Sequence, residues 1–200
     1  MTADDVVRPS WRSVVALALG TVVLVLAGCG GTKSPARQGP SANESVTGFA
    51  TSDAAVDSLI VPSISVNRAV VKGTLDATGR MVPPAGAHDV AYYEYSGRPG
   101  QGNAVFSGHV DYVGVGPAVF WDLQKVKVGD EVVVTLADGL RLRYSVRFNV
   151  VFDATSGPWE TLFGAQAVAD GLTLYTCDGD FDPASSTYNK RRVVRADRVG

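Results

Sequence analysis

Three side chains of this sequence, in the order histidine, cysteine and arginine, could together carry out acyl transfer. They are His109, within the segment Ser-Gly-His-Val-Asp, followed by Cys177 and Arg191. A cysteine thiolate attacks a carbonyl carbon, an imidazole moves protons, and a guanidinium steadies the substrate or the oxyanion that forms. These residue types therefore predict nucleophilic catalysis with Cys177 as the nucleophile.

The strand predicted around Cys177 indicates that its thiol is accessible. Successive side chains of a strand point to opposite faces, so Leu172 and Leu174 share one face while Tyr175 and Cys177 share the other. If the leucines face the core, Cys177 faces outward at the end of the strand. A free cysteine is often only a small buried residue, and the alternation argues against that interpretation here.

The N-terminus predicts export. Arg8 and Arg12 precede an apolar run at 14–27, which is typical of a secretory signal. The run leads into Leu-Ala-Gly-Cys at 26–29, which resembles the bacterial lipobox, in which the cysteine, here Cys29, is lipidated and becomes the mature N-terminus.

The alternative is an uncleaved transmembrane anchor, because residues 13–32 are uncharged and a span needs about 20 such residues. The small residues before Cys29 favour the lipoprotein. Both interpretations tie the chain to the extracytoplasmic face of the membrane and prevent Cys29 from pairing with Cys177. Exported proteins usually pair their cysteines, so an unpaired Cys177 indicates a reactive thiol.

The composition is that of an ordinary globular domain, with 46% hydrophobic and 19% charged residues. The net charge of -2 offers no basic field for nucleic acid. Residues 30–54 are rich in small and polar residues and predict a flexible tether. The tether would join the signal or anchor at 1–29 to a folded domain at 55–200.

The folded part is predicted to be all-β, because 22 glycines and 10 prolines favour many turns. Asp138-Gly139 is a strong signal for a hairpin. Strands are expected at 59–61, 66–71, 103–107, 131–136, 140–152, 172–176 and 191–196, with a short helix at 118–123. The pattern alone leaves a barrel and a sandwich open.

From about residue 59 to residue 199 the chain resembles the sortases, the cysteine transpeptidases of Gram-positive cell surfaces. Thr-Leu-Tyr-Thr-Cys at 173–177 is similar to the family's TLxTC signature, and Ser-Gly-His at 107–109 matches the segment holding its histidine. Arg191 falls where the family's arginine lies. Finer features, such as Gly-His-Val-Asp at 108–111, look like the class F group common in actinobacteria.

The resemblance implies a closed eight-stranded β-barrel with short helices and a catalytic trio of His109, Cys177 and Arg191. It implies cleavage of an LPxTG-like sorting signal between Thr and Gly through a thioester. The thioester is then resolved by an amine, for attachment to a peptidoglycan precursor, or by water. No cofactor is implied. Some sortases bind calcium through an acidic loop, and we do not predict this here because the strands lack a clear acidic cluster nearby.

Two features depart from the family pattern. Asp178 stands where the class F group often has glycine, which places an anion beside the thiolate and would raise the pKa of Cys177. The lipobox is the second departure, since sortases are more often held by a transmembrane helix.

Other residues near these motifs allow alternative assignments of the base, of an orienting acid and of a metal site. His109 is preferred over His88 as the base, because His88 sits in a loop with no strand to fix it. Asp111 could orient the imidazole, although a surface acid is the more common role. A metal site from His109, Asp111, Cys177 and Asp178 lacks the paired spacing of known sites and ranks low.

Alternation in the last strand assigns the catalytic role to Arg191 rather than Arg192. Arg192, Val194 and Ala196 share one face, which we take as the core side. Arg191 then shares the outer face with Arg195, because Arg195 cannot readily be buried without a partner. Arg192 is expected to turn to water. A bulge before Val193 would exchange the two arginines.

Two other functions remain open. An L,D-transpeptidase is also an extracytoplasmic cysteine enzyme, but that family has histidine and glycine directly before its cysteine, where this chain has Tyr175 and Thr176. A non-catalytic surface-binding lipoprotein on the same barrel is the second alternative.

Overall fold

The structure is a computed structural model that describes residues 48–166 and 168–200. The signal or anchor predicted at 1–29, Cys29 and most of the tether at 30–54 lie outside the described residues. Within the described part, no helix has the length and apolar character needed to cross a membrane.

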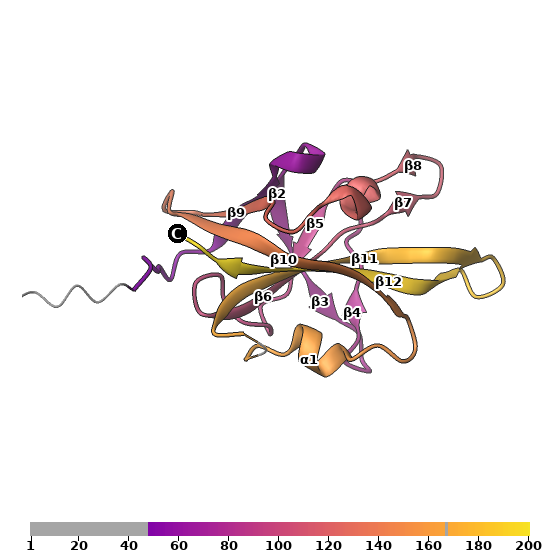
Figure 1. The fold of residues 1–200 in the computed structure, drawn as a ribbon. Helices are drawn as coiled ribbons and strands as arrows, with labels where there is room; N and C mark the ends of the chain where they lie inside the picture. The colour runs from indigo at the N-terminus through magenta and orange to yellow at the C-terminus, as the bar shows by residue number, and fades with distance from the viewer. Residues whose placement is uncertain (1–47, 167) are drawn as a thin grey trace, which may run out of the picture. The chain divides into compact units, whose positions relative to one another are not determined.

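Eight strands form a closed barrel, in the order β1-β2-β5-β6-β11-β12-β10-β9 (Figure 1). Their bounds are β1 Val56–Val61, β2 Val66–Lys72, β5 Val90–Tyr92, β6 Gly102–Ser107, β9 Glu131–Leu136, β10 Arg141–Asp153, β11 Asp170–Asp182 and β12 Thr187–Arg198. The pairs β2–β5 and β6–β11 are parallel and the other neighbours are antiparallel. The expected closed eight-stranded barrel is confirmed, and the sandwich is excluded.

Smaller elements decorate the barrel. Two short two-stranded sheets are formed by β3 (Thr74–Leu75) with β4 (Met81–Val82) and by β7 (Asp111–Tyr112) with β8 (Gly116–Pro117). The helices are η1 (Pro62–Ile64), η2 (Trp121–Lys125) and α1 (Trp159–Phe163). The helix expected at 118–123 is therefore a 3₁₀ turn that begins at Trp121.

The barrel interior is filled by apolar side chains from every second residue of the strands. In β10, Leu142, Tyr144 and Val146 are buried while Arg141 and Arg143 are exposed. The hairpin predicted at Asp138-Gly139 joins β9 to β10, and Gly139 has a φ of 88°, which a residue without a side chain adopts most easily.

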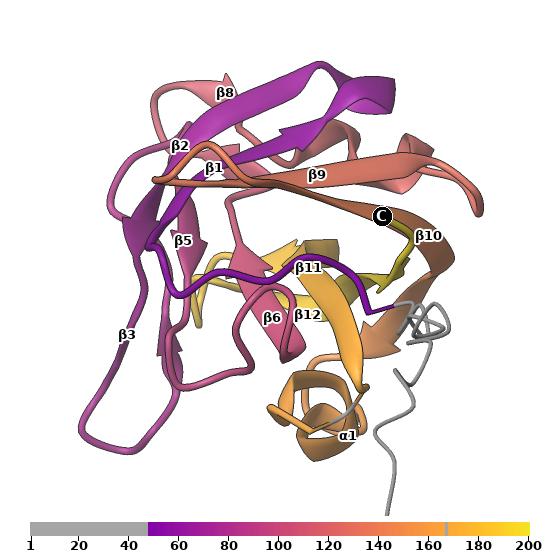
Figure 2. The same ribbon diagram turned by 90° about the vertical axis from the view of Figure 1, so that its left-hand side faces the viewer.

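One outer face of the barrel is also covered, by α1. The backbone oxygen of Leu162 accepts hydrogen bonds from Asn103 Nδ2 on β6, Thr173 Oγ1 on β11 and Arg195 Nη2 on β12, at 2.9, 3.2 and 2.8 Å. Figure 2 shows α1 outside the barrel, beside β11. Burial on both sides explains why every residue of β6 is buried.

The position of α1 contradicts the prediction that Arg195 is solvated. Arg195 does lie on the outer face of β12, but it is 4% exposed rather than solvated. Its Nη2 bonds to the Leu162 oxygen, while its buried Nε has no partner, and burial lowers the pKa of this guanidinium. The position of α1 could not be predicted from the alternation of β12.

The last two strands extend beyond their predicted ends. β11 runs on to Asp182 and β12 begins at Thr187, so that the hairpin projects past the barrel, as β7 and β8 do above it (Figure 1). These two projections frame the candidate site.

Candidate active site

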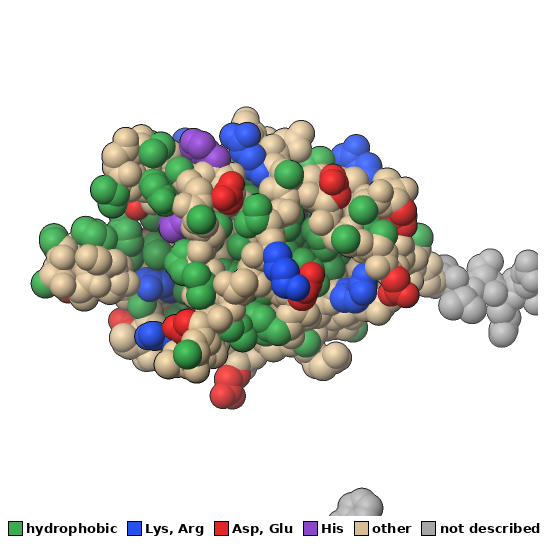
Figure 3. Space-filling view, turned by 180° about the vertical axis from the view of Figure 1, so that it is seen from behind, with side chains coloured by type: hydrophobic (Ala, Val, Ile, Leu, Met, Phe, Trp, Pro, Cys, Tyr) green, Lys and Arg blue, Asp and Glu red, His purple; other side chains and the backbone are tan. Residues whose placement is uncertain are grey.

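A cavity of about 640 Å³ opens between the β7–β8 sheet and the β11–β12 hairpin. It brings together the three side chains expected to act together, His109, Cys177 and Arg191. The remaining lining residues are Pro83, Val110, Asp111, Tyr112, Val113, Phe181, Ser186, Thr187 and Tyr188. Figure 3 shows a hollow between two projecting lobes, with basic and histidine side chains in its walls beside hydrophobic ones.

Cys177 lies near the point where β11 leaves the barrel. Leu172 and Leu174 are fully buried in the core, and Cys177 lines the cavity on the other face, as the alternation predicts. Its thiol is free and half-buried. Thr173 shares the face of Cys177 but is buried under α1, so only the end of this face is accessible.

The surroundings of Cys177 oppose ionisation of the thiol. Burial raises the pKa of Cys177, the nearby Arg191 guanidinium lowers it, and the carboxylates of Asp111 and Asp178 raise it further. The thiol is therefore protonated at rest near neutral pH, and Arg191 is the group that most favours the thiolate.

His109 follows β6 directly and is held on two sides. Its Nε2 lies 2.7 Å from the Pro84 oxygen, and its ring packs edge-on against Tyr112, with centroids 5.1 Å apart. Because a carbonyl oxygen only accepts, Nε2 carries a hydrogen in this arrangement. This leaves Nδ1 as the nitrogen free to exchange a proton.

The preceding Gly108 explains part of the motif. A Cβ atom at Gly108 would lie 2.5 Å from Val119 Cγ1 and 2.8 Å from Phe120 Cδ2, so a larger residue would push the histidine segment off the barrel. His88, by contrast, is exposed and does not line the cavity.

Arg191 lies directly opposite Cys177 in the β11–β12 ladder. Its Nε donates to the Tyr175 hydroxyl at 3.0 Å, Nη1 to the Tyr188 oxygen at 2.6 Å, and Nη2 to Thr187 Oγ1 at 3.2 Å. Tyr175 in turn packs edge-on against Phe163 of α1 at 5.0 Å. The guanidinium is therefore fixed beside the thiol.

The register places the two arginines on the faces that the alternation predicts. The β11–β12 bulge falls between Asp178 and Phe181, beyond Cys177, so Arg191 and Cys177 share a face. Arg192 lies on the opposite face and does not line the cavity.

Arg192 nevertheless contradicts the prediction that it turns to water. Its side chain is only 17% exposed, and its Nε lies 2.7 Å from Asp178 Oδ2. Its Nη1 donates to Asn149 Oδ1 at 2.9 Å. The side chain points into the end of the barrel, where β10 supplies the second partner.

Asp111 has a partner other than the imidazole. Its Oδ2 accepts a 2.6 Å hydrogen bond from the Tyr188 hydroxyl, which links β7 to β12 across the cavity. Burial, and then this carboxylate, raise the pKa of Tyr188 to about 12. The partly buried Asp111 carboxylate is thus paired with Tyr188. In the described ranges, no three side chains of histidine, cysteine, aspartate or glutamate are grouped so as to hold a metal ion.

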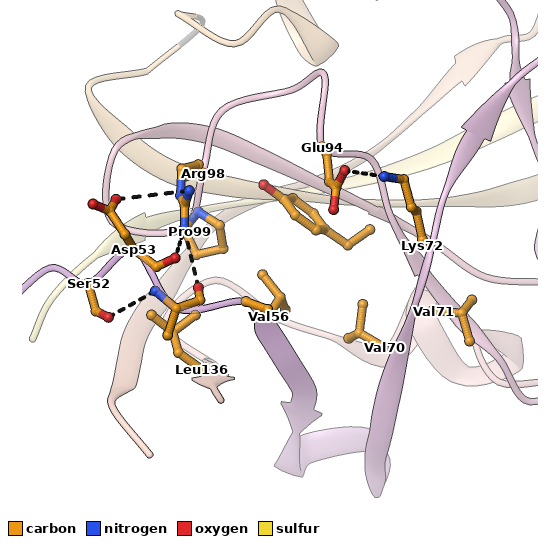
Figure 4. Close-up of a pocket in the computed structure, with 13 residues that line it drawn as sticks. Ser52, Asp53, Val56, Val70, Val71, Lys72, Glu94, Arg98, Pro99 and Leu136 are labelled. Atoms are coloured by element: carbon orange, nitrogen blue, oxygen red, sulfur yellow. Dashed lines mark hydrogen bonds and ion pairs between the residues drawn. The ribbon is translucent and has the colours of Figure 1, made fainter. Parts of the chain in front are cut away.

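A second cavity, of about 580 Å³, lies where the described chain enters the barrel (Figure 4). Its lining includes no cysteine or histidine. Its charged side chains pair with each other, Lys72 with Glu94 at 2.6 Å and Arg98 with Asp53 at 3.9 Å. It therefore lacks the cysteine and histidine that the predicted chemistry requires, and the first cavity is the candidate active site.

Comparisons with known proteins identify the fold and the family. A sortase A lid mutant from Corynebacterium diphtheriae is 26% identical, with a TM-score of 0.54 over 72% of this chain and 70% of that one. Sortase A from Listeria monocytogenes is 25% identical, with a TM-score of 0.53 over 74% and 89%. A Clostridium perfringens sortase D5 transpeptidase, at 19% identity and a TM-score of 0.53 over 73% and 79%, shares the fold.

None of the curated proteins compared with this sequence matches it. The family model of the sortase domain matches residues 59–199, which include the whole cavity and all eight strands but the first three residues of β1. With this match and the barrel in agreement, the chain belongs to the sortase family.

Proposed function

We propose that this protein is a cysteine transpeptidase that cleaves an LPxTG-like sorting signal between Thr and Gly and transfers the acyl part to an amine. The observation that carries the proposal is the meeting of His109, Cys177 and Arg191 in one cavity. Its subtype is proposed to be class F-like, on the motif at 108–111.

In the first half-reaction, the Cys177 thiol gives its proton to the His109 imidazole, which becomes an imidazolium, and the sulfur attacks the threonine carbonyl carbon. The C–N bond to glycine breaks, and the leaving amine takes a proton from the His109 imidazolium. The product is a thioester on Cys177. In the second half-reaction, an amine gives its proton to His109, attacks the thioester and releases the thiolate; water in place of the amine gives hydrolysis.

Arg191 has two roles in this scheme. Its charge favours the thiolate, against the burial and the two carboxylates that oppose it. The guanidinium is held by its bonds to the Tyr175 hydroxyl, to Thr187 Oγ1 and to two backbone oxygens, and the second hydrogen of Nη2 is left to bind the peptide backbone or the oxyanion during attack.

The rim of the cavity suits an extended peptide with apolar side chains. Val113 is 94% exposed at the tip between β7 and β8, and Phe181 is 48% exposed on the opposite hairpin. Covering exposed apolar side chains of this kind with a ligand contributes favourable binding free energy.

The proposed site of action is the extracytoplasmic face of the membrane, with the chain held by lipidation of Cys29 or by an uncleaved helix at 13–32. Mass spectrometry of the native protein distinguishes these anchors: a mass that lacks residues 1–28 supports lipidation, and a mass that retains them supports the helix. Cys29→Ala should block processing only in the first case.

The enzymatic proposal is tested by mixing the full chain with a library of LPxTG-like peptides and trapping the acyl-enzyme by mass spectrometry. The expected adduct maps to Cys177, is absent from Cys177→Ala, and disappears on addition of an amine. If Cys177→Ala cleaves peptides as well as the natural chain, the proposal is wrong. If no peptide forms an adduct and the natural chain only binds peptides, a non-catalytic surface protein is the better interpretation.

A further inference from the structure

Asp178 places a negative charge next to the nucleophile in the chain, and the structure shows how this charge is held. Asp178 Oδ2 and Arg192 Nε are 2.7 Å apart, with the two side chains 25% and 17% exposed. Their charges are screened less by water than those of a surface pair. Asp178 is thus bound on the face of β11 opposite to Cys177.

Arg192 is itself fixed from behind. Its Nη1 donates to Asn149 Oδ1, and Asn149 Nδ2 donates to the backbone oxygens of Leu123 and Val126, both at 2.9 Å. Asn149 therefore connects the guanidinium to the backbone of η2 and of the residue that follows it. A side chain held at both ends loses little further freedom when it pairs with a carboxylate.

The other groups facing the thiol come from several elements. Asp111 on β7 is occupied by Tyr188, Arg191 on β12 is opposite in the ladder, Tyr175 precedes on β11, and His109 lines the same cavity. The negative charges of Asp111 and Asp178 disfavour the thiolate, and the positive charge of Arg191 favours it. A cation bound to Asp178 outside the cavity would reduce the effect of that carboxylate on the thiol.

We propose that Arg192 is a positioning residue, which binds the Asp178 carboxylate and keeps its charge from suppressing thiolate formation at Cys177. The inference rests on the proposed role of Cys177 as nucleophile and adds a second arginine to the same site. Arg192 does not line the cavity, so it acts through Asp178.

The test measures the thiol itself. The full chain is alkylated with iodoacetamide from pH 5 to pH 11, and the modified peptide containing Cys177 is quantified by mass spectrometry, which separates it from Cys29. Arg192→Ala should move the alkylation midpoint to higher pH and lower the rate at neutral pH by roughly threefold or more, because the thiolate fraction falls. Adding Asp178→Asn to Arg192→Ala should return the midpoint to the natural position or below.

Arg147→Ala is the matched control, because Arg147 also pairs with a carboxylate, that of Asp197 at 3.4 Å, but on the exposed surface. Its midpoint should equal that of the natural chain. The proposal is overturned if Arg192→Ala behaves like Arg147→Ala, or if adding Asp178→Asn gives no recovery.

Two further variants guard against misfolding. Arg192→Gln keeps most of the volume and should shift the midpoint upward as Arg192→Ala does. Asp178→Asn alone should shift it downward, and an unchanged or raised midpoint in that variant contradicts the proposal. None of these readouts needs peptide cleavage, so a failed transpeptidase assay leaves this test intact, and a failed alkylation test leaves the transpeptidase proposal intact.

Discussion

β11 and β12 are joined by two arginine–aspartate pairs, one beside the cavity and one at the end of the ladder farthest from it, and the pairs differ in what surrounds them. Near the cavity, Arg192 and Asp178 pair at 2.7 Å behind the nucleophile. At the other end, Arg198 and Asp170 pair at 3.3 Å with the arginine side chain only 2% exposed. The same two residue types are thus used in two environments of one hairpin.

The pair at the far end serves the entering chain. Arg198 Nη2 donates to the Ala50 oxygen at 3.0 Å, and its guanidinium lies over the rings of Phe49 and Tyr144 at 5.1 and 5.7 Å. Burial raises the pKa of Asp170. The difference in surroundings indicates different roles. The Arg192–Asp178 pair affects the ionisation of Cys177, and the Arg198–Asp170 pair holds the segment that leads into the barrel.

The largest effect is expected from Arg198→Ala, which should reduce stability without changing the thiol. Arg198→Ala leaves Asp170 without its cation and removes the contacts to Ala50 and Phe49. We expect it to lower the free energy of unfolding by about 3 kcal/mol, as for a broken buried pair. Urea unfolding measures this loss. The alkylation midpoint of Cys177 should stay unchanged under native conditions, and a shifted midpoint would show that both ends influence the thiol.

His109→Ala should have the next largest effect, on activity alone. The leaving amine then lacks its proton donor, which costs on the order of a hundredfold in kcat. Steady-state cleavage of a sorting peptide measures the loss. His88→Ala is the matched control, since His88 is exposed outside the cavity, and equal or greater damage from His88→Ala would reverse the assignment.

Substitutions of Arg191 separate its charge from its geometry. Arg191→Lys keeps the cation but loses the planar donors, so kcat/KM should fall about tenfold while the alkylation midpoint changes little. Arg191→Gln removes the main group that lowers the pKa of Cys177, so its midpoint should move to higher pH, with activity recovering partly as the pH rises. Alkylation profiles of both variants decide this. Matching midpoints in the two variants would mean that the charge of Arg191 does not act on the thiol.

The smallest expected effect concerns the link across the cavity. Tyr188→Phe removes the 2.6 Å hydrogen bond to Asp111 and keeps the ring contact with Phe181, at 5.2 Å between centroids. The loss of about 1 kcal/mol should appear as a several-fold rise in KM with little change in kcat. Peptide titrations measure both constants, and a change confined to kcat would place Tyr188 in the chemistry instead.

The features of the site that the sequence predicts are those set by residues close together in the chain. The side of β11 that carries Cys177, and the shared face of Cys177 and Arg191, follow from alternation within single strands, which the residues specify locally. The hairpin at Gly139 is local in the same way.

The errors come from contacts between distant segments. Arg195 is buried because the segment that contains α1 covers it, and its Nη2 bonds to the Leu162 oxygen. Arg192 has a second partner, Asn149, on β10, where a bulge between Val146 and Phe148 shifts the register. β5, β7 and β8 are too short to show a period. Strand alternation carries no information about what covers a face.

The parallel pairing of β6 with β11 has a consequence for how the candidate site is assembled. Ser107 pairs with Tyr175 at the end of this pairing, and His109 and Cys177 each lie two residues further along their chain segments. Parallel neighbours require a long crossover, here containing β9 and β10, and such non-local pairing is slow to form. The side chains of His109 and Cys177 therefore come to share one cavity only when the last hairpin docks. Acyl transfer at this site would then report the completion of folding, because a partly folded chain has a thiol without a neighbouring imidazole.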